Sequence, residues 1–371
     1  MKTITNVSFA LVALLCVAVS GGASAQTIDG PGSCGGIGGI WSAANPPQRE
    51  NRPVQRYGRC TLHSSYIARA PQNFFIAPGV EMVIGISGVL VNEGYLEIPN
   101  TAALIIAEGE LHNTGHVYAD NSGELWFFSG RFENLPEGEI EIEGDFFTEP
   151  LPHGAPQGRN DCANNRGLMH FYSGGNVHNR GCIDNFSLGF NDPGTFNVLR
   201  DGTFHNHTTG LHRTGLSDII AGTFINYATA YLENVGRTVV QHDGSITNNG
   251  RISIAREYLL LNAGTSMTTN SSGEVTLDGG DMYVHGIYTS NGGSIFGSRR
   301  GTFTVGGDGE FYFNGGSRAW ANGQVDVVNN GLILSDCVVF WYPPRSFTGR
   351  DLMRKRCGPP VPIKPRPIFP F

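Results

Sequence analysis

Apolar and polar residues alternate along most of the chain, in short runs separated by glycine and asparagine. Residues 94–98 (GYLEI), 138–144 (GEIEIEG) and 250–255 (GRISIA) each place every second side chain on one face. Alternation of this kind predicts β-strands with one buried and one exposed face. Because the pattern returns many times without a helical period, we expect an all-β protein.

A motif of the form apolar-x-Asn, followed closely by glycine, returns at regular intervals. Asn92, Asn113 and Asn134 are 21 residues apart, and from Asn206 to Asn291 the spacings are 20, 22, 22 and 21. A repeat of this length is typical of a solenoid. It predicts a single-stranded, right-handed β-helix with coils of about 21 residues. Each strand would pair with its equivalent in the next coil, about 4.8 Å away.

The recurring asparagines have a structural role in such a fold. An Asn amide at a corner can bond the same side chain one coil above and one below, and such ladders stabilise stacked strands. Asn and glycine also tolerate the backbone of a tight corner. We expect the structural ladder to consist of Asn92, Asn113, Asn134, Asn179, Asn206, Asn226 and Asn248.

The start of the chain has the features of a secretory signal peptide. Residues 1–25 contain a lone Lys2, an apolar stretch at 9–19 and small residues that end at Ala25. This arrangement predicts cleavage after Ala25 and a secreted protein, extracellular or held in a cell wall. No later stretch of about 20 apolar residues predicts a membrane span.

The remaining chain divides by composition into four segments. We expect an N-terminal cap at 26–76, the solenoid at 77–336, a C-terminal cap at 337–357 and an extended tail at 358–371, which has six prolines in fourteen residues. Caps are expected because open coil ends expose unpaired strand edges. Residues 149–167 break the repeat and predict a protruding loop.

Disulfides are expected, because secretion implies an oxidising compartment. The candidate cysteines are Cys34, Cys60, Cys162, Cys182, Cys337 and Cys357. Six cysteines allow 15 pairings. We favour neighbours in the sequence (34–60, 162–182 and 337–357), because short loops close at the lowest entropic cost. These pairs would pin the caps.

The low charge and the acidic balance of the chain argue against nucleic acid as a binding partner. Glycine accounts for 52 of the 371 residues, and only 15% are charged. The mature chain has 24 Lys and Arg (25 less Lys2) against 32 Asp and Glu. Nucleic acid would need a basic face, so we do not expect it as a partner.

Histidines are the candidates for a metal site. His112 and His116 form one close pair, and His205 and His207 form another. The chain has no Cys-x-x-Cys or His-Glu-x-x-His pattern. We therefore expect exposed imidazoles beside corners and no metal or other cofactor.

Catalysis is the main alternative to a binding role. Glycoside hydrolysis needs carboxylates that converge on one bond. The densest acidic segment, DGGD at 278–281, lacks the Asn-x-Asp, Asp-Asp and Gly-His-Gly set of polygalacturonases. Most acids alternate with apolar residues, as at 139–143, which indicates a solvated face rather than an active site.

The sequence bears on two other surface features, ice binding and glycosylation. Ice binding would need Thr-x-Thr rows on successive coils, and only Thr302-x-Thr304 fits that pattern. Of the Asn-x-Ser/Thr sequons in the mature chain, Asn185 lies outside the repeat and is the glycosylation candidate.

Three segments carry a family resemblance. At residues 111–117 (LHNTGHV), 177–183 (VHNRGCI) and 246–254 (ITNNGRISI) the sequence resembles the N-terminal ligand-binding domain of fungal hyphally regulated cell-wall adhesins. The pattern is also similar to that of filamentous-haemagglutinin-like bacterial adhesins. The resemblance covers roughly residues 77–365 and implies a β-solenoid that takes part in attachment. The fungal proteins continue into a Ser/Thr-rich stalk and a lipid-anchor signal, which this sequence lacks, and no ligand residues carry over.

Together these observations predict a secreted, non-enzymatic adhesin or structural component of a cell wall or extracellular matrix. Its expected partners are wall or matrix polysaccharide, or the surface of a host or neighbouring cell. A rigid rod would bind them through many weak contacts, and lateral self-association is compatible with this shape. The alternative is a secreted polysaccharide lyase or hydrolase with a β-helix fold.

Overall fold

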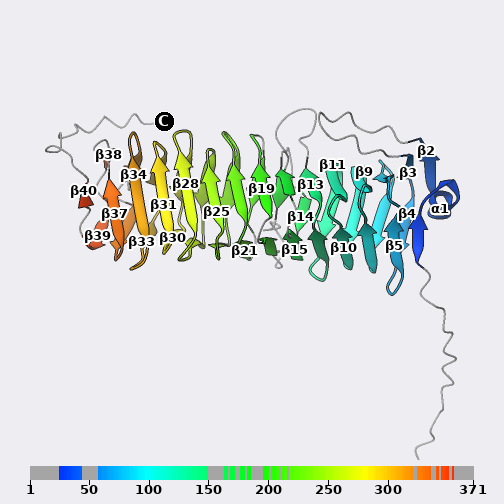
Figure 1. The fold of residues 1–371 in the computed structure, drawn as a ribbon, viewed down its shortest axis with the longest axis horizontal. Helices are drawn as coiled ribbons and strands as arrows, with labels where there is room; N and C mark the ends of the chain where they lie inside the picture. The colour runs from blue at the N-terminus through cyan, green and yellow to red at the C-terminus, as the bar shows by residue number, and fades with distance from the viewer. Residues whose placement is uncertain are drawn as a thin grey trace, which may run out of the picture.

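The structure is a computed structural model. It describes residues 25–43, 57–148, 163–165, 168–171, 176–179, 182–184, 195–199, 202–208, 210–214, 217–320, 324–335, 340–341, 344–350 and 353–354. Within these residues the chain winds into a rod, with its N-terminal part at one end and the later strands following in order along the axis (Figure 1). Each turn contributes three short strands, and equivalent strands of successive turns pair in parallel.

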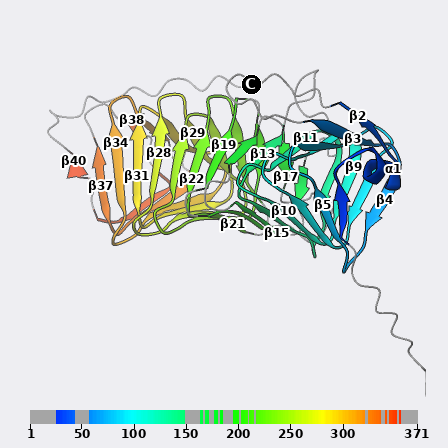
Figure 2. The ribbon, with the colours of Figure 1, turned by 45° about the vertical axis from the view of Figure 1, so that its right-hand side comes forward.

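Three columns of strands, here called sheets 1, 2 and 3, run the length of the rod (Figure 2). The strands of sheet 1 are β3 (Gly58–Leu62), β6 (Val80–Ile84), the first part of β9 (Ala103–Asn113) and of β11 (Glu124–Asn134), β13 (Asp145–Thr148), β16 (Asn176–Asn179), β19 (Thr203–Asn206), β22 (Thr223–Asn226), β25 (Ser245–Asn248), β28 (Ser266–Asn270), β31 (Ile287–Asn291), β34 (Glu310–Asn314), β37 (Leu332–Ser335) and β40 (Met353–Arg354).

Sheet 2 follows sheet 1 in each turn. Its strands are β4 (Ser65–Ala68), β7 (Val89–Asn92), the second part of β9 and of β11, β14 (Ala163–Asn165), β17 (Cys182–Asp184), β20 (Leu211–Arg213), β23 (Tyr231–Asn234), β26 (Arg251–Ile254), β29 (Glu274–Leu277), β32 (Ser294–Gly297), β35 (Arg318–Trp320) and β38 (Phe340–Trp341).

Sheet 3 closes each turn and has 14 strands. They are β1 (Gln26–Ile28), β5 (Asn73–Ile76), β8 (Tyr95–Ile98), β10 (His116–Ala119), β12 (Glu139–Ile142), β15 (Leu168–Phe171), β18 (Thr195–Val198), β21 (Ser217–Ile220), β24 (Arg237–Val240), β27 (Tyr258–Leu261), β30 (Asp281–Val284), β33 (Gly301–Val305), β36 (Val325–Asn329) and β39 (Ser346–Gly349). The fold is therefore the β-solenoid that the repeat predicts, with coils of about 21 residues.

The core fills the inside of the rod with the apolar half of each alternating strand. Leu96, Val117 and Ile140 lie opposite one another in β8, β10 and β12 and are fully buried. Each such side chain contributes about 1.5–3 kcal/mol on burial. A single coil cannot cover its own apolar face, so stability depends on the stacking of neighbours.

Two long strands bend from sheet 1 into sheet 2. β9 and β11 have 11 residues each. At this corner Gly130 has a φ of 97°, which favours glycine. A Cβ at Gly130 would also lie 2.1 Å from the carbonyl oxygen of Gly109 in the coil below. Glycine at this corner therefore allows the two coils to approach closely.

The N-terminal end is closed by the helix α1 (Pro31–Gly36) and by β2 (Gly39–Ser42), which is antiparallel to β3. The Cys34–Cys60 disulfide ties α1 to β3, which confirms a disulfide-pinned cap at this end. β3, β4 and β5 already pair with β6, β7 and β8. A complete coil thus lies inside the segment that the sequence assigns to the N-terminal cap (26–76).

The C-terminal segment also contains solenoid strands. β38, β39 and β40 pair in parallel with β35, β36 and β37, and all three lie within the segment that the sequence assigns to the C-terminal cap (337–357). Within the predicted loop at 149–167, residues 163–165 instead form β14 of sheet 2. The rest of that loop lies outside the described residues, as do Cys162, Cys337, Cys357, Asn185, the tail at 358–371 and all but the last residue of the predicted signal at 1–25; the side chain of Cys182 is not described either.

Candidate functional site

The motif asparagines form two buried columns that run along the rod. In each column the side chains come from the last residues of successive strands, one column in sheet 1 and the other in sheet 2. The sheet 2 column holds Asn92, Asn113, Asn134 and Asn165, and the sheet 1 column holds Thr148, Asn179, Asn206, Asn226 and Asn248. All nine side chains are 0% exposed. The sequence treats the seven predicted asparagines as one series. Both columns cross a longer coil, with 31 residues from Asn134 to Asn165 and from Thr148 to Asn179.

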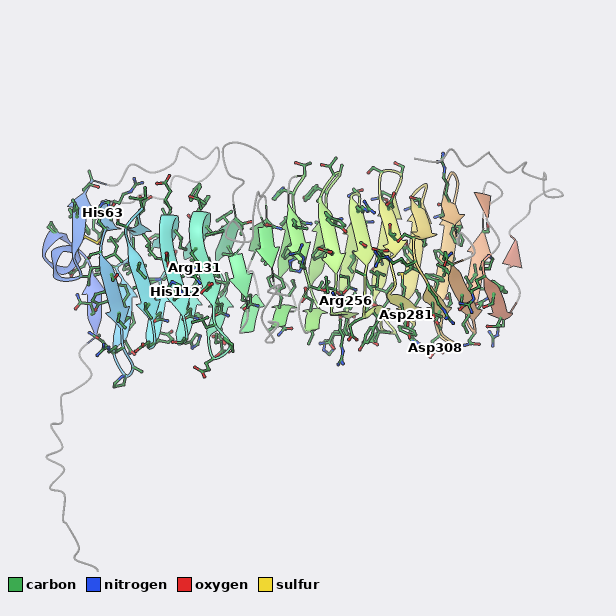
Figure 3. All side chains as sticks on the ribbon, turned by 180° about the vertical axis from the view of Figure 1, so that it is seen from behind. His63, His112, Arg131, Arg256, Asp281 and Asp308 are labelled. Carbon is green, nitrogen blue, oxygen red and sulfur yellow. A yellow bond between two sulfur atoms is a disulfide. The ribbon has the colours of Figure 1, made fainter. Side chains whose placement is uncertain are left out.

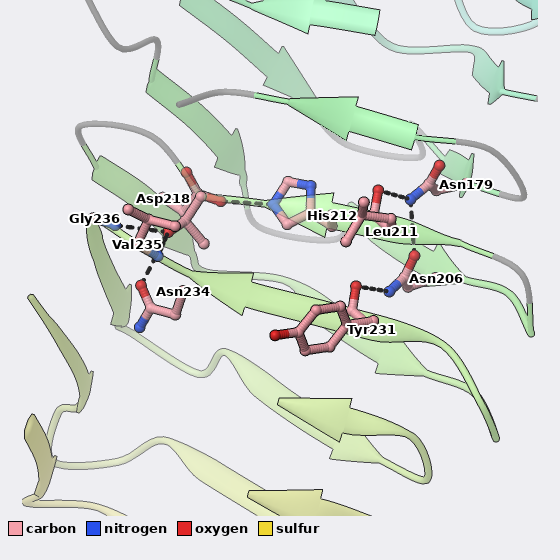
Figure 4. Close-up of polar contacts among 10 residues, drawn as sticks. Asn179, Asn206, Leu211, His212, Asp218, Tyr231, Asn234, Val235 and Gly236 are labelled. Atoms are coloured by element: carbon pink, nitrogen blue, oxygen red, sulfur yellow. Dashed lines mark hydrogen bonds and ion pairs between the residues drawn. The ribbon is translucent and has the colours of Figure 1, made fainter. Parts of the chain in front are cut away.

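Between the two ends of a column, each amide accepts a hydrogen bond from the coil before it and donates one to the coil after it. Asn206 accepts a hydrogen bond from Asn179 and donates one to Asn226, both at 2.8 Å. Its Nδ2 also donates to the carbonyl oxygen of Tyr231 at 3.2 Å (Figure 4). At the start of the sheet 2 column, Asn92 Oδ1 has no partner, because the preceding coil has Ala68 at this position. These amides are buried and hydrogen-bonded within the solenoid, so a ligand cannot reach them.

One coil carries a polar pair inside the core. His212 in β20 and Asp218 in β21 both point inward, and Nε2 of the imidazole lies 2.7 Å from Oδ2 of the carboxylate (Figure 4). The side chains are 1% and 4% exposed. The rings of Phe196 and Phe204 pack against the imidazole at 4.9 Å. The pair has no access to solvent, so it belongs to the core and not to a substrate site.

A small cavity adjoins this pair. It offers about 10 Å³ of water-accessible space and is lined in part by His212, Asp218 and Thr238, which is close to the volume that one water needs. His212 Nδ1 and Thr238 Oγ1 are buried without a hydrogen-bond partner. Sequence reasoning missed this cluster, because His212 and Asp218 occupy inward positions where the alternation predicts apolar residues.

The outward face of sheet 2 is covered by ion pairs. His112 lies between two carboxylates, with Nε2 2.8 Å from Glu110 and Nδ1 3.1 Å from Glu133. Arg131 lies 2.8 Å from Glu133, and Figure 3 shows Arg131 beside His112. Further pairs are Arg213 with Glu233 and Arg251 with Glu274. Charges on this face are thus largely neutralised by their own neighbours.

These contacts shift the titration of the cluster. The hydrogen bond that His112 donates to Glu133 raises the pKa of His112 above its ordinary value, against an opposing effect of burial. The same hydrogen bond lowers the pKa of Glu133, and Arg131 adds to the effect. His112 was a candidate for a metal site with His116, but their nearest acidic partners differ, since His116 lies 3.2 Å from Glu141 in sheet 3.

The outward face of sheet 3 is acidic and aromatic near the N-terminal end. Strands β8, β10 and β12 present Tyr95, Glu97, His116, Tyr118, Glu139 and Glu141. Burial, followed by nearby carboxylates, raises the pKa of Tyr95. Burial and a hydrogen bond to Glu143 raise the pKa of the Tyr118 phenol. Both phenols are therefore protonated at neutral pH. No Lys or Arg points outward from these three strands.

A third face, on sheet 1, carries no carboxylate, lysine or arginine over five strands. This neutral face consists of the outward residues of β19, β22, β25, β28 and β31 and the residues that follow the first three of these strands: Thr203, His205, His207, Thr223, Ile225, Tyr227, Ser245, Thr247, Asn249, Ser266, Thr268, Asn270, Ile287, Thr289 and Asn291. None of these is Asp, Glu, Lys or Arg, and all are at least partly exposed.

Two rows give the neutral face its order. Thr247, Thr268 and Thr289 lie opposite one another in successive strands. At the strand ends, Asn270 donates to Asn249 at 2.8 Å, which forms an outer amide row. Neighbours are about 4.8 Å apart between strands and about 6.6 Å apart along a strand, because alternate residues share a face. The result is a regular grid of groups that both donate and accept hydrogen bonds.

The N-terminal edge of the neutral face is aromatic. The rings of His207 and Tyr227 stack at 5.2 Å with a 3° angle between their planes, and His205 Nδ1 lies 3.1 Å from the Tyr227 hydroxyl. Burial lowers the pKa of His205, which keeps this imidazole neutral at pH 7. The histidine pair that the sequence offered as a metal candidate therefore belongs to an aromatic cluster.

The sequence did not reveal the neutral face as a unit. It holds only fragments of Thr-x-Thr, and Ser245-x-Thr247 and Ser266-x-Thr268 differ from that pattern by one residue type. Columns form because the registers align Thr247 with Thr268 and Ser245 with Ser266. The signal that could have found them is a comparison of equivalent positions in successive repeats.

The described residues hold neither a metal cluster nor a membrane-spanning helix. No group of three or more His, Cys, Asp or Glu among them is arranged to hold a metal ion. No helix in that part of the chain is both long and apolar enough to cross a membrane. In comparisons with known proteins, no family model matches the chain, and no curated protein has a sequence that matches it.

Proposed function

We propose that the protein is a secreted, non-enzymatic adhesin or structural component of a cell wall or extracellular matrix, and that it binds neutral polysaccharide along the neutral face. The observation that carries this proposal is the uncharged grid of hydroxyl and amide groups on five successive strands of sheet 1. Sugar hydroxyls both donate and accept hydrogen bonds, as do Ser, Thr and Asn side chains.

The rigidity of the solenoid favours this mode of binding. Its side chains are held in rows by the ladders and by the core, so little conformational entropy is lost when a polymer binds. Each contact is weak in water, but a polymer that spans several coils makes many contacts at once. The aromatic cluster at Tyr227 adds a flat, partly apolar surface with a polar edge against which a sugar ring can pack.

Binding to insoluble polymers tests the proposal. The mature chain is incubated with β-glucan, with chitin and, as an anionic comparison, with polygalacturonate, and the bound fraction is measured against concentration. A double variant, Thr247→Glu with Thr268→Glu, places two charges in the middle of the neutral face. We expect it to weaken binding to the neutral polymers about tenfold or more, because two carboxylates lose hydration on contact.

The matched control is Ser294→Glu, since Ser294 is a partly exposed, outward residue of sheet 2. We expect this variant to bind as the wild type does. Equal binding by the wild type and the double variant would remove the neutral face from the proposal. Binding to polygalacturonate alone would contradict the class of ligand.

A second candidate function rests on the acidic face of sheet 3. Glu97 and Glu141 lie in one outward row and Glu139 in the next, and several carboxylates on one lateral face are what a polysaccharide-degrading enzyme would need. Release of reducing ends or of unsaturated products from the same polymers would support it. Loss of that release in Glu97→Gln and Glu141→Gln variants would place the activity on this face.

A further inference from the structure

The C-terminal half of sheet 3 has an outward stripe of apolar side chains. Ile219, Val239, Leu260 and Tyr283 lie opposite one another in β21, β24, β27 and β30. All four are partly exposed. The same row is acidic near the N-terminal end of the rod, where it holds Glu97 and Glu141. A continuous apolar stripe of this kind marks an interaction surface more often than a scattered apolar residue does.

A second row beside the stripe has opposite charges at its two ends. Arg237, Tyr258 and Asp281 lie opposite one another in β24, β27 and β30, and Figure 3 shows Asp281 in the C-terminal half of the rod. Among the residues that the structure describes, Arg237 has only a loose pairing with Glu257, at 3.7 Å and with both side chains about half exposed. Its guanidinium is thus available for a partner.

These two rows are complementary to themselves. A second copy rotated by 180° about an axis along β27 keeps each position along the strand and reverses the order of coils. Arg237 then faces Asp281 of the second copy, and Asp281 faces Arg237 of that copy. Leu260 of one copy faces Leu260 of the other on the twofold axis, and Val239 of each copy faces Tyr283 of the other. Such a twofold arrangement is the usual form of a homodimer contact.

We propose that this surface, formed by β21, β24, β27, β30 and β33, joins two copies of the chain side by side with their rod axes antiparallel. The charge row fixes the register, because a shift by one coil would separate Arg237 from Asp281. The proposal does not rest on polysaccharide binding, and the neutral face lies on a different sheet. Antiparallel pairing would therefore leave a neutral face available on each copy.

The size of the surface sets the expected affinity. Five strands span about 24 Å along the rod, and four residues of each strand about 13 Å across it. A contact of these dimensions belongs to the small end of protein interfaces, where association is weak and transient. We therefore expect a reversible dimer that forms at micromolar concentrations or above, and whose register is set by charge.

Sedimentation velocity of the mature chain over a range of concentrations tests the proposal. We expect a monomer–dimer equilibrium in the wild type. Arg237→Asp and Asp281→Arg should each weaken dimerisation about tenfold or more, because each places like charges opposite one another. The double variant, Arg237→Asp with Asp281→Arg, restores both opposite pairs and should recover affinity close to that of the wild type.

Two further variants separate association from folding. Leu260→Glu brings two carboxylates together on the twofold axis and should abolish the dimer, whereas Thr247→Glu, on the neutral face, should leave it unchanged. Asp281 also accepts a hydrogen bond from the Thr302 amide at 2.7 Å, so thermal unfolding of each monomer is measured alongside. A chain that stays monomeric at every concentration, or a dimer that the charge reversals and Leu260→Glu leave unchanged, would overturn the proposal.

Discussion

At the scale of the residue, asparagine performs two tasks on two sides of the same strands. Inward, Asn206 is fully buried and bonded above and below. Outward, Asn249 and Asn270 form a partly exposed row on the neutral face. The inward amides donate hydrogen bonds toward the next coil. The stability of the ladder therefore depends more on the Nδ2 donor than on the shape of the side chain.

Replacement of one ladder amide by a carboxylate should be costly and dependent on pH. In Asn206→Asp the carboxylate would face two acceptors, Asn226 Oδ1 and the Tyr231 carbonyl. Loss of two buried donors and burial of a charge should lower the free energy of unfolding by about 3 kcal/mol or more at pH 7. Both effects raise the pKa of the new carboxyl above its unfolded value of about 3.9.

The sign of the pH dependence follows. The folded variant binds its proton more tightly than the unfolded chain, so the penalty relative to the wild type is complete above the raised pKa. It shrinks as pH falls toward about 4. Urea unfolding of variant and wild type at pH 4.5 and 7 measures this change. Asn249→Asp is the control, because it keeps an acceptor for Asn270; equal penalties at 206 and 249 would contradict the ladder.

A second residue-scale prediction concerns His112. Its pKa is raised from an ordinary value of 6.5, so its pairing stabilises the fold fully below that value and less as pH rises through the folded pKa. Glu133, whose pKa is lowered from 4.5, contributes above 4.5 and loses its contribution in acid. The cluster should therefore stabilise most between these two values.

The measurement compares the wild type with His112→Gln. We expect the difference in free energy of unfolding to be largest near pH 5.5 and smaller at pH 8, and to stay below about 1 kcal/mol because the cluster is partly exposed. An NMR titration should give His112 a pKa above 6.5. A value below that would show that burial outweighs the carboxylates.

At the scale of the element, each coil stacks on its neighbours through a mainly apolar core edged by the buried amide columns, and one coil also carries a His–Asp pair there. The coil of β19, β20 and β21 holds His212 and Asp218 in place of aliphatic side chains. Desolvation of two such groups offsets much of their attraction. This coil therefore owes less of its stability to the hydrophobic effect than the coils around it.

A double-mutant cycle tests this account. Asp218→Leu or His212→Leu alone should cost about 3–5 kcal/mol, because each leaves a buried polar partner without its bond. The double variant should regain most of that loss or exceed the wild type, since a matched apolar pair avoids desolvation. Hydrogen exchange in β19–β24 together with urea unfolding measures the effect. Additive losses in the double variant would contradict it.

At the scale of the whole molecule, the rod is a one-dimensional stack in which each coil contacts only its neighbours. The N-terminal end is secured by the Cys34–Cys60 disulfide, which closes a loop of 26 residues. Cross-links of this length typically contribute about 3 kcal/mol. In a stack, a loss of stability at one end should remain near that end.

Replacement of both cysteines by alanine tests this behaviour. We expect faster amide exchange in β2, β3 and β6, and unchanged exchange in strands beyond the middle of the rod, such as β31 and β34. Hydrogen exchange followed by mass spectrometry resolves these segments. Uniformly faster exchange along the whole rod would show that the solenoid unfolds as one cooperative unit.

The sequence by itself determined the strands and the coil, because it repeats with two periods. Alternation with a period of two residues fixes strands and their inward faces. The return of Asn near every 21 residues fixes the coil. Asn92 and Asn113 were identified as structural from spacing alone, and the Cys34–Cys60 pair followed from proximity in the sequence.

Only the tertiary structure decided the register between coils, because the repeat period does not encode it. The register in turn decides which residues become neighbours. Spacing could not show that Asn134 and Asn179 belong to different columns, since insertions change the coil length. Nor could it bring His212 to Asp218, or align Thr247 with Thr268 into a face. Each of these depends on which residue of one coil lies above which residue of the next, and only the stacked chain fixes that.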